Sequence, residues 1–400
     1  MYHCVRYLYL FCIIMITPVL IKHIASTFKK KFKVEPLLIN SPGRINLIGE
    51  HTDYNEGFVF PAAIDQVIIT AIQKSKSKIC TVVADDLSET HEFSLNNTEA
   101  LKNGNWKNYI LGVVAEIQKK GKHLNNFNLV FGGNIAIGAG LSSSAALENS
   151  IVFGLNELFD LKLSKEEMIL ISQKAEHNYA GVKCGIMDQY ASMFGEKNKA
   201  LFLDCRTVKA SPIEIDLKDH ELLLINTNVK HSLAESAYNN RRSVCEKVAQ
   251  MLNISALRDA SEKDLIKIKS SLTEDDFQKA SYVIQENNRV KKALEVIKNR
   301  DLNSLGKLFY ASHRGLQHQF KVSCSELDFL VEKAKESPFV IGSRMMGGGF
   351  GGCTINIIKK DSIPPYSDFI KKEYLKKFNA ACSFYRIRLS KGTHLINSVS

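Results

Sequence analysis

Residues 127–158 read FNLVFGGNIAIGAGLSSSAALENSIVFGLNEL, and this stretch decides the fold. Every second residue from Phe127 to Phe131 is apolar, which predicts a β-strand. From Leu147 to Leu158 the apolar residues recur at helical spacing instead, so a helix is expected there. Glycines and serines lie between the two patterns. The stretch therefore predicts a strand, a glycine-serine loop and a helix in succession.

The loop between them, GAGLSSSAALE from Gly138 to Glu148, is suited to binding an anion. Glycines allow the backbone to approach a phosphate closely, and the start of a helix presents unpaired N–H groups to it. The three serine hydroxyls can add hydrogen bonds or a metal ligand. The loop lacks the lysine of a Walker A sequence. A plain turn with a serine N-cap is the alternative interpretation.

The rest of the chain alternates helical patterns with strand patterns. The segment SKEEMILISQKAEHNYAG starts at Ser164, a residue type that caps helices, has acidic residues in its first turn and ends near Gly181. Later strand patterns lie at Glu221–Ile225 and Thr354–Ile358. This mixture predicts an α+β chain.

The length of 400 residues allows two domains of ordinary size, each with its own core. A boundary between Asp204 and Leu217 is plausible, because Ser211-Pro212 precedes a new strand pattern. We expect an N-terminal extension at residues 1–21, a first domain at 22–210 and a second domain at 211–400.

Cysteine content and net charge narrow the class of protein. The nine cysteines are scattered and form no CxxC pair, so neither a disulfide framework nor a zinc site is indicated, and a reducing cytoplasm is expected. The net charge of +11 comes from short separate clusters, without the aromatic pattern of nucleic-acid binders. We expect no nucleic-acid partner; the charge instead suits a substrate that carries several phosphates.

The N-terminal segment Tyr7–Ile21 is apolar and follows Arg6, so a signal peptide must be considered. The run is shorter than the roughly 20 residues of a spanning helix, and Pro18 interrupts it. Met15 offers an alternative start that opens an amphipathic helix. We therefore expect residues 1–14 to be an upstream extension without stable membrane association; a weak membrane tether is the alternative.

The segment SPGRINLIGEHTDYNEGFVFP, residues 41–61, places Arg44, Glu50, His51 and Asp53 within ten positions. Groups of this kind can pair with the donors and acceptors of a polar ligand. A solvated surface loop is the alternative interpretation.

A further acidic pair lies in AEHNYAGVKCGIMDQYAS, residues 175–192. Glu176 is near a helix end, and Asp188 follows Gly185 on a loop or at a helix start. Carboxylates are hard oxygen ligands that suit Mg²⁺, which bridges them to phosphate. An N-cap role for Asp188 is the alternative.

A second glycine cluster, MMGGGFGGCTINII, covers residues 345–358. Such a density of glycine directly before an apolar strand marks a loop that another group approaches closely. A flexible hairpin is the alternative.

Together these motifs resemble those of the GHMP kinases, and within that family those of the enzymes that phosphorylate galactose. The resemblance runs from about Asn40 to the C-terminus, and four separate motifs occur in the family's order. The motifs are GRINLIGEHTDYNEG (43–57), GAGLSSSAALE (138–148), CGIMDQ (184–189) and GGGFGGCT (347–354).

The resemblance implies a fold, a reaction and a location. The implied fold is the GHMP kinase fold, with a ribosomal-protein-S5-like N-terminal domain, a ferredoxin-like C-terminal domain and the active site between them. The implied reaction moves the γ-phosphoryl of ATP to the anomeric hydroxyl of α-D-galactose, the first committed step of galactose catabolism. Mg²⁺ is the implied cofactor, and a cytoplasmic monomer is expected.

The resemblance also assigns roles to individual residues. Asp188 would take the proton from the sugar hydroxyl O1, with Arg44 beside it at the reacting phosphoryl group. Ser144 and Glu176 correspond to the Mg²⁺ ligands. The implied sugar-binding residues are Glu50, His51, Thr52, Asp53, Gly185 and Tyr238. The implied nucleotide-binding residues are Gly138, Ala139, Gly140, Leu141, Ser142, Ser143, Ser144 and Trp106, although core packing is an alternative for Trp106.

Two departures from the family pattern and three rival functions remain. Ala136 replaces a usual proline and Met346 a common threonine, changes that would loosen loops without removing a charged or metal-binding group. The rivals are a kinase for N-acetylgalactosamine or another sugar, a non-catalytic galactose sensor, and a nucleic-acid-binding protein. The complete sequence Ser142–Ala146 argues against the sensor, because fungal sensors lack part of it.

Overall fold

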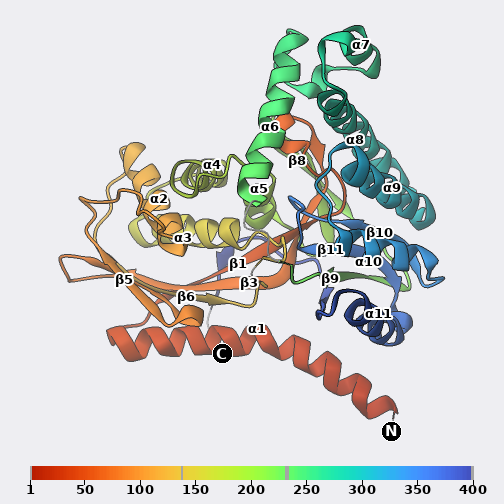
Figure 1. Ribbon diagram of the computed structural model, residues 1–400. Helices are drawn as coiled ribbons and strands as arrows, with labels where there is room; N and C mark the ends of the chain where they lie inside the picture. The colour runs from red at the N-terminus through yellow and green to blue at the C-terminus, as the bar shows by residue number, and fades with distance from the viewer. Residues whose placement is uncertain (1, 137, 230–233, 398–400) are drawn as a thin grey trace.

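The computed structural model describes residues 2–136, 138–229 and 234–397, and within these it leaves the side chains of residues 2–16 and 234–236 undescribed. The described chain forms three sheets covered by helices (Figure 1). The first sheet has the strand order β13 (His394–Leu395), β1 (Leu37–Asn46), β3 (Pro61–Lys74), β6 (Phe127–Gly133), β4 (Cys80–Ala84), β5 (Glu89–Phe93). The second has the order β10 (Val340–Met345), β11 (Cys353–Lys359), β9 (His220–Asn226), β12 (Ser383–Ile387). The third consists of β2 (Phe58–Val59), β7 (Lys199–Asp204) and β8 (Lys209–Glu214).

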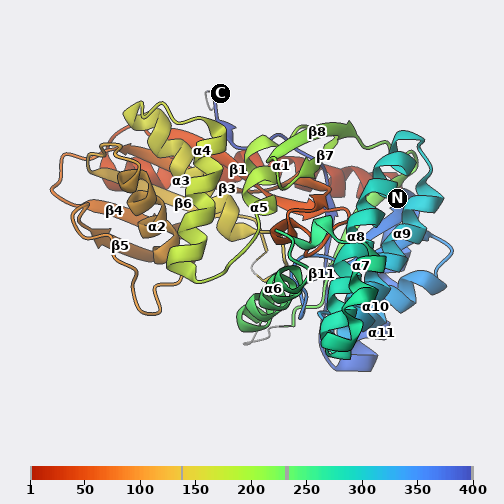
Figure 2. The same cartoon turned by 90° about the horizontal axis from the view of Figure 1, so that it is seen from above.

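Helices cover the sheets in two groups. Those of the first half are α1 (Tyr2–Phe32), α2 (Trp106–Lys119), α3 (Ser143–Phe159), α4 (Lys165–Ala175) and α5 (Met187–Phe194). Those of the second half are α6 (Ala234–Met251), α7 (Glu262–Lys267), α8 (Glu274–Lys298), α9 (Leu302–Arg314), α10 (Ser325–Glu336) and α11 (Ile363–Phe378). In Figure 2, α7 to α11 gather at the opposite end of the molecule from β4 and β5.

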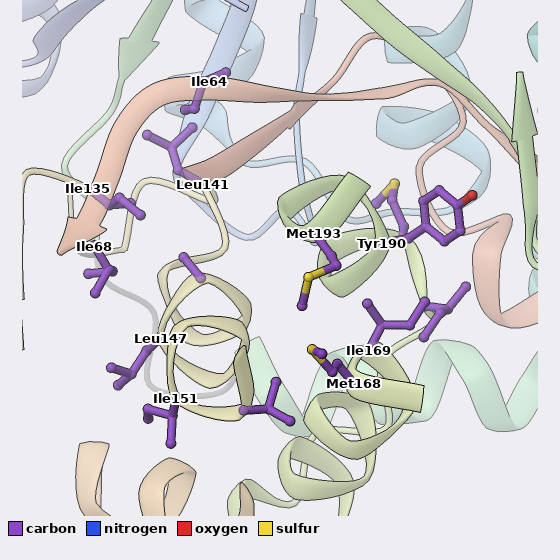
Figure 3. Packing of buried hydrophobic residues seen from close by; sticks show 14 of the residues in the cluster. Ile64, Ile68, Ile135, Leu141, Leu147, Ile151, Met168, Ile169, Tyr190 and Met193 are labelled. Carbon is purple, nitrogen blue, oxygen red and sulfur yellow. The ribbon is translucent and has the colours of Figure 1, made fainter. Parts of the chain in front are cut away.

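Both faces of the first sheet are buried. In β3, Val67 and Ile69 face α1, where they pack with Ile24 and Phe28. The alternate residue Ile68 belongs to the large core on the other face, which α3 and α4 cover. Figure 3 shows this core from close by, with Leu147 and Ile151 of α3 and Met168 and Ile169 of α4 among its labelled side chains. Alternate residues of β3 therefore contribute their side chains to two separate hydrophobic layers, one on each face of the sheet.

The end of the chain returns to the first sheet. Strand β13 pairs antiparallel with β1, joining Ile39 to Leu395. Next to this pair, the hydroxyl of Thr393 lies 2.9 Å from the Ser41 hydroxyl and donates to the carbonyl of Ser192 in α5 at 2.9 Å. The last residues thus tie β1 to α5.

The main sequence predictions for local structure are confirmed. The strand, loop and helix of residues 127–158 appear as β6 and α3. Ser164 caps α4 in a complete capping box with Glu167. The strand patterns in the second half lie within β9 and β11, and the mixed sheet and helix content confirms the α+β class.

Ser211-Pro212 precedes the strand β9, as expected, but the pair is not in a linker. Both residues lie inside β8, where Pro212 pairs with Leu201. Strand β8 is at the edge of its sheet, where a missing N–H costs no ladder hydrogen bond. The expected domain boundary at residues 210 and 211 falls within this strand, and the division into domains stays a prediction.

The expected extension at residues 1–21 runs without a break into α1, which has Pro18 in its interior. Met1 lies outside the described residues, and so do the side chains of residues 2–16, so the role of the extension stays a prediction. Within the described parts of the chain, no helix combines the length and apolar character needed to cross a bilayer.

Candidate active site

One pocket brings together seven of the predicted site residues from distant parts of the sequence. Its walls come from the loop after β1, the end of α4, the start of α5, α6 and the second glycine cluster. The pocket is lined by Arg44, Glu50, His51, Asp53, Glu176, Val182, Cys184, Met187, Asp188, Tyr238, Gly347 and Gly348.

An arginine–aspartate pair forms the centre of this pocket. Arg44 Nε donates to Asp188 Oδ1 at 2.9 Å, and Nη2 donates to Oδ2 at 3.0 Å. The remaining guanidinium nitrogen, Nη1, donates to the carbonyl of Gly140. The β1–β3 register shifts between Pro42 and Arg44, and such a bulge re-aims a side chain. A planar fork that holds a carboxylate in this way also presents a fixed positive charge to a phosphate.

The predicted phosphate loop, residues 138–144, contacts both acidic residues of the site. Ser142 Oγ donates to Asp188 Oδ2 at 2.5 Å, and its backbone is left-handed, with φ of 57°. Ser144, in the first turn of α3, donates to Glu176 Oε1 at 2.9 Å. The loop therefore links the start of a helix to two carboxylates, which is a suitable arrangement for a phosphate and a cation.

The second glycine cluster lies against the phosphate loop. A side-chain carbon on Gly347 would stand 3.4 Å from the carbonyl oxygen of Gly140, and one on Gly352 would stand 3.4 Å from that of Ala139. The prediction that another group approaches this cluster closely is confirmed. Met346, the departure from the family pattern, is buried, and its sulfur accepts from the backbone N–H of Asn46 at 3.4 Å.

Glu176 is held by partners on two helices. It starts a π-helical turn, η3 (Glu176–Ala180), that continues α4, and such turns often occur at functional sites. Ser144 of α3 donates to one of its oxygens, and Gln189 Nε2 of α5 donates to the other at 2.9 Å. Burial and the nearby Asp188 raise the pKa of Glu176 to about 7. A bound cation would favour its ionised form.

His51 and Tyr238 form an aromatic wall. The His51 ring lies 5.3 Å from that of Tyr238, and its Nδ1 is 2.9 Å from the Tyr54 hydroxyl. Burial lowers the pKa of His51 to about 3, so the ring is uncharged at neutral pH. Its Nε2 is buried and has no hydrogen-bond partner among the described residues. A ligand hydroxyl is the natural partner for this nitrogen.

Asp53 and Gly185 are in contact. A side-chain carbon on Gly185 would come within 2.0 Å of Asp53 Oδ2, so only glycine fits there. Burial and the negative charge of Asp188 raise the pKa of Asp53 to about 7. Asp53 thus lies near enough to Asp188 for the two carboxyl groups to interact electrostatically.

Among the predicted site residues that do not line the pocket, Thr52 and Trp106 have other partners. Thr52 is fully buried, and its hydroxyl donates to the carbonyls of Gly49 and Phe58 at 2.9 and 2.7 Å, which closes the loop around it. Trp106 packs in the main core, and its indole N–H donates to Glu89 at 3.0 Å. These contacts match the packing alternative for Trp106.

Three further residues near the site were missed from the sequence. Arg344 and Gln189 each bind a carboxylate that lines the pocket. Glu148 is fully buried, neither of its carboxyl oxygens has a partner in the described chain, and burial with the nearby Glu176 raises its pKa well above the usual range. Each stands within or next to a predicted motif, but no residue pattern indicates which neighbour of a motif reaches the site.

Family models match three parts of the chain. A galactokinase galactose-binding signature covers residues 26–74, the N-terminal domain of GHMP kinases covers 108–196, and their C-terminal domain covers 290–374. A galactokinase from Thermosipho africanus is 40% identical over 88% of this chain and 98% of its own length. A galactokinase from Clostridium beijerinckii is 40% identical over 93% and 98%.

Solved structures share the architecture. The galactokinase of Lactococcus lactis, complexed with galactose, superposes with a TM-score of 0.90 at 33% identity over 94% of this chain and 99% of its own. A mevalonate kinase from Methanococcus jannaschii, 18% identical over 89% and 99% with a TM-score of 0.63, shares the fold. The fold and site are those of a GHMP kinase. Within that class, the chain belongs to the galactokinase family.

Proposed function

We propose that this chain transfers the γ-phosphoryl group of ATP to the O1 hydroxyl of α-D-galactose, giving galactose 1-phosphate and ADP. The observation that carries the proposal is the bidentate Arg44–Asp188 pair, in one pocket with Glu50, His51 and Asp53. Carboxylates and a neutral imidazole can pair with the hydroxyls of a sugar and reject sugars whose hydroxyls are misplaced.

The chemistry follows from the placement of the central pair. Asp188 accepts the proton of O1 as that oxygen bonds to the γ-phosphorus. The bond between the γ-phosphorus and the bridging oxygen breaks, and ADP leaves with its electron pair. Arg44 holds Asp188 in place through two hydrogen bonds and stabilises negative charge on the transferring group. Positioning and electrostatics supply most of the rate in such transfers.

Ser144 and Glu176 fit the magnesium ion that the family uses. A hydroxyl and a carboxylate 2.9 Å apart are hard ligands, and a cation there would offset the repulsion that raises the pKa of Glu176. In the described residues, no cluster of three acidic, histidine or cysteine side chains could hold a metal. Mg²⁺ commonly takes its remaining ligands from water and phosphate, where it neutralises phosphate charge.

We also propose a cytoplasmic location and a monomeric state. Seven cysteines of the described chain carry free thiols, which supports a reducing compartment. Fractionation of cells and sedimentation of the purified protein test these two proposals.

The reaction is tested by measuring ADP release with galactose, N-acetylgalactosamine, glucose and mevalonate. We expect turnover with galactose well above that with the other three. Turnover that is higher with N-acetylgalactosamine would assign another sugar kinase, and galactose binding without turnover would assign a sensor.

Substitution of the proposed base gives a second test. Asp188→Asn should leave the fold intact and lower phosphoryl transfer at least about a hundredfold, the lower range for a lost general base. Circular dichroism checks the fold of the variant. Turnover within a few-fold of the original protein would overturn the role given to Asp188.

A further inference from the structure

A fully buried arginine joins the two halves of the molecule behind the pocket. Arg344 lies in β10 of the second sheet, and its side chain is 0% exposed. Its Nε donates to the carbonyl of Leu47 and its Nη2 to that of Asn46, both at 2.8 Å. Asn46 is the last residue of β1, in the first sheet, and Leu47 directly follows it. The guanidinium therefore crosses from one sheet to the other.

The same guanidinium binds a carboxylate of the pocket. Arg344 Nη2 donates to Glu50 Oε1 at 2.8 Å, and the backbone N–H of Gly347 donates to the same oxygen at 2.9 Å. The other oxygen, Oε2, has no hydrogen bond within the described residues, and Glu50 lines the pocket. One oxygen of Glu50 is therefore fixed by the protein, while the other is left for a ligand.

Because Arg344 is buried, few other side chains could take its place. A buried charge is tolerated when it is paired and its hydrogen bonds are made, and Arg344 also donates Nη1 to the carbonyl of Met345 at 2.6 Å. Because an arginine fork is planar and always charged, its four acceptors fix the position of the Glu50 carboxylate. Lysine has no such planar fork and cannot make the same hydrogen bonds to all four acceptors.

We propose that Arg344 is a positioning residue for sugar recognition, which holds Glu50 so that Oε2 accepts a hydrogen bond from a galactose hydroxyl. This inference rests on the proposed function, since it requires galactose in the pocket. Arg344 itself touches neither substrate. Its removal should weaken the affinity for galactose and spare that for ATP, because the phosphate loop at residues 138–144 lies on a different element.

A purely structural role makes a different prediction. Arg258 provides the matched comparison, because it makes the same two kinds of contact. It donates to the backbone carbonyl of Glu56 at 2.9 Å, and it pairs with the carboxylate of Asp204. Arg258 does not contact Glu50. Loss of general support would lower stability in both arginine variants without a selective change in galactose affinity.

The experiment measures kcat and the KM values of galactose and ATP for Arg344→Lys, Arg344→Met and Arg258→Met, with calorimetric galactose binding as a readout independent of turnover. We expect the two Arg344 variants to raise the galactose KM and dissociation constant at least about tenfold, as loss of a charged hydrogen bond predicts, with much smaller changes for ATP. Arg258→Met should leave the galactose constants near those of the original protein.

A double-mutant cycle measures the coupling between Arg344 and Glu50. Glu50→Gln should raise the galactose KM by itself, and adding Arg344→Met should then have little further effect, because the two residues act as one unit. Three outcomes would overturn the proposal in favour of a structural role. The effects of the two substitutions on the galactose KM could multiply in the double variant, folded Arg344→Lys could bind galactose unchanged, or both Arg344 variants could fail to fold. Absence of galactose turnover in the unaltered protein would instead overturn the proposed function.

Discussion

At the scale of single residues, two neighbouring serines of the phosphate loop have different surroundings. Ser142 donates to the same Asp188 oxygen that Arg44 binds. The side-chain hydroxyl of Ser143, the next residue, makes no hydrogen bond within the part of the chain that the structure describes. The proposed base, Asp188, is therefore held by a residue of the loop that is expected to bind ATP. Ser142 thus links the proposed binding sites of the two substrates.

This contrast predicts different outcomes for two similar substitutions. Ser142→Ala removes a hydrogen bond to a charged group, so kcat should fall about tenfold or more, whereas Ser143→Ala should have a much smaller effect. Steady-state kinetics with both substrates varied measures this. An unchanged kcat together with a raised ATP KM in Ser142→Ala would show that the hydroxyl serves the nucleotide instead of Asp188.

The carboxyl of Asp53 predicts a pH dependence of stability. Its pKa is about 7 in the folded protein, mainly because of burial, against about 3.9 in an unfolded chain. Between these values the folded protein binds more protons than the unfolded chain, so the free energy of unfolding falls as the pH rises from about 4 to 7. Asp53→Asn removes this contribution, and its stability should decline less steeply.

Urea denaturation of the ligand-free proteins at several pH values tests this expectation. Glu176 and Glu148 have raised pKa values as well, so the Asn variant should keep part of the slope. Identical slopes in the two proteins would contradict the assignment of a raised pKa to Asp53.

At the scale of elements, α1 covers one face of the first sheet through a few apolar side chains. Ile24 and Phe28 are fully buried against Val67, Ile69 and Val130 of β3 and β6. Without α1, this face of the sheet would be open to water, since α3 and α4 lie on the opposite face (Figure 1). The helix is thus part of the fold of the first sheet, at least from Ile24 to Phe28.

Phe28→Ala should lower the free energy of unfolding by about 3–5 kcal/mol, the usual range for loss of a buried aromatic side chain. Val19→Ala is the matched control on the same helix, because Val19 is 57% exposed. It should change stability by no more than about 0.5 kcal/mol. Equal stabilities for the two variants, measured by chemical denaturation, would show that α1 does not support the sheet.

Elements with a clear period or cap could be predicted from the sequence. The alternation at Phe127–Phe131, the helical spacing after Leu147 and the capping serine Ser164 each depend on nearby residues alone, and β6, α3 and α4 follow them. Strand β8 was not predicted from the sequence, because its tolerance of Pro212 depends on its place at a sheet edge, which is a property of the assembled sheet.

The site was predictable to the extent that its motifs are contiguous. Arg44 and Asp188 lie in recognisable segments, and the pocket contains both. The position of Thr52 inside its own loop, and the reach of Arg344 to Glu50, follow from tertiary packing between residues far apart in sequence. Local patterns carry no information about such contacts.

At the scale of the whole molecule, the second half of the chain holds the sugar-binding segment of the first half. In α8, Tyr282 donates to the carbonyl of Glu50 at 3.1 Å, and Glu286 accepts from the N–H of Gly49 at 3.1 Å. Asn287 accepts from the N–H of Phe58 at 2.8 Å. With Arg344 on the other side, these contacts fix the segment between α8 and β10. The pocket therefore needs both halves.

Two adjacent asparagines of α8 test this support. Asn287 is buried and Asn288 is exposed. Asn287→Ala leaves the part-buried N–H of Phe58 without its partner, which should cost about 1 kcal/mol of stability. Asn288→Ala should be close to neutral in the same denaturation experiment. Equal effects of the two substitutions would mean that the hydrogen bond between Asn287 and Phe58 does not contribute to the stability of the protein.

The return of β13 to the edge of β1 makes the position of α5 depend on a segment that is synthesised long after it. On the ribosome, N-terminal segments fold first where they can, but here the partner of Ile39 is Leu395, and the residue that joins Ser41 to α5 is Thr393. A nascent chain that stops before Thr393 carries Asp188 on a helix without this attachment. We therefore expect a chain truncated before Thr393 to bind and turn over galactose poorly, which galactose titration and an ADP-release assay on the purified truncated protein would measure.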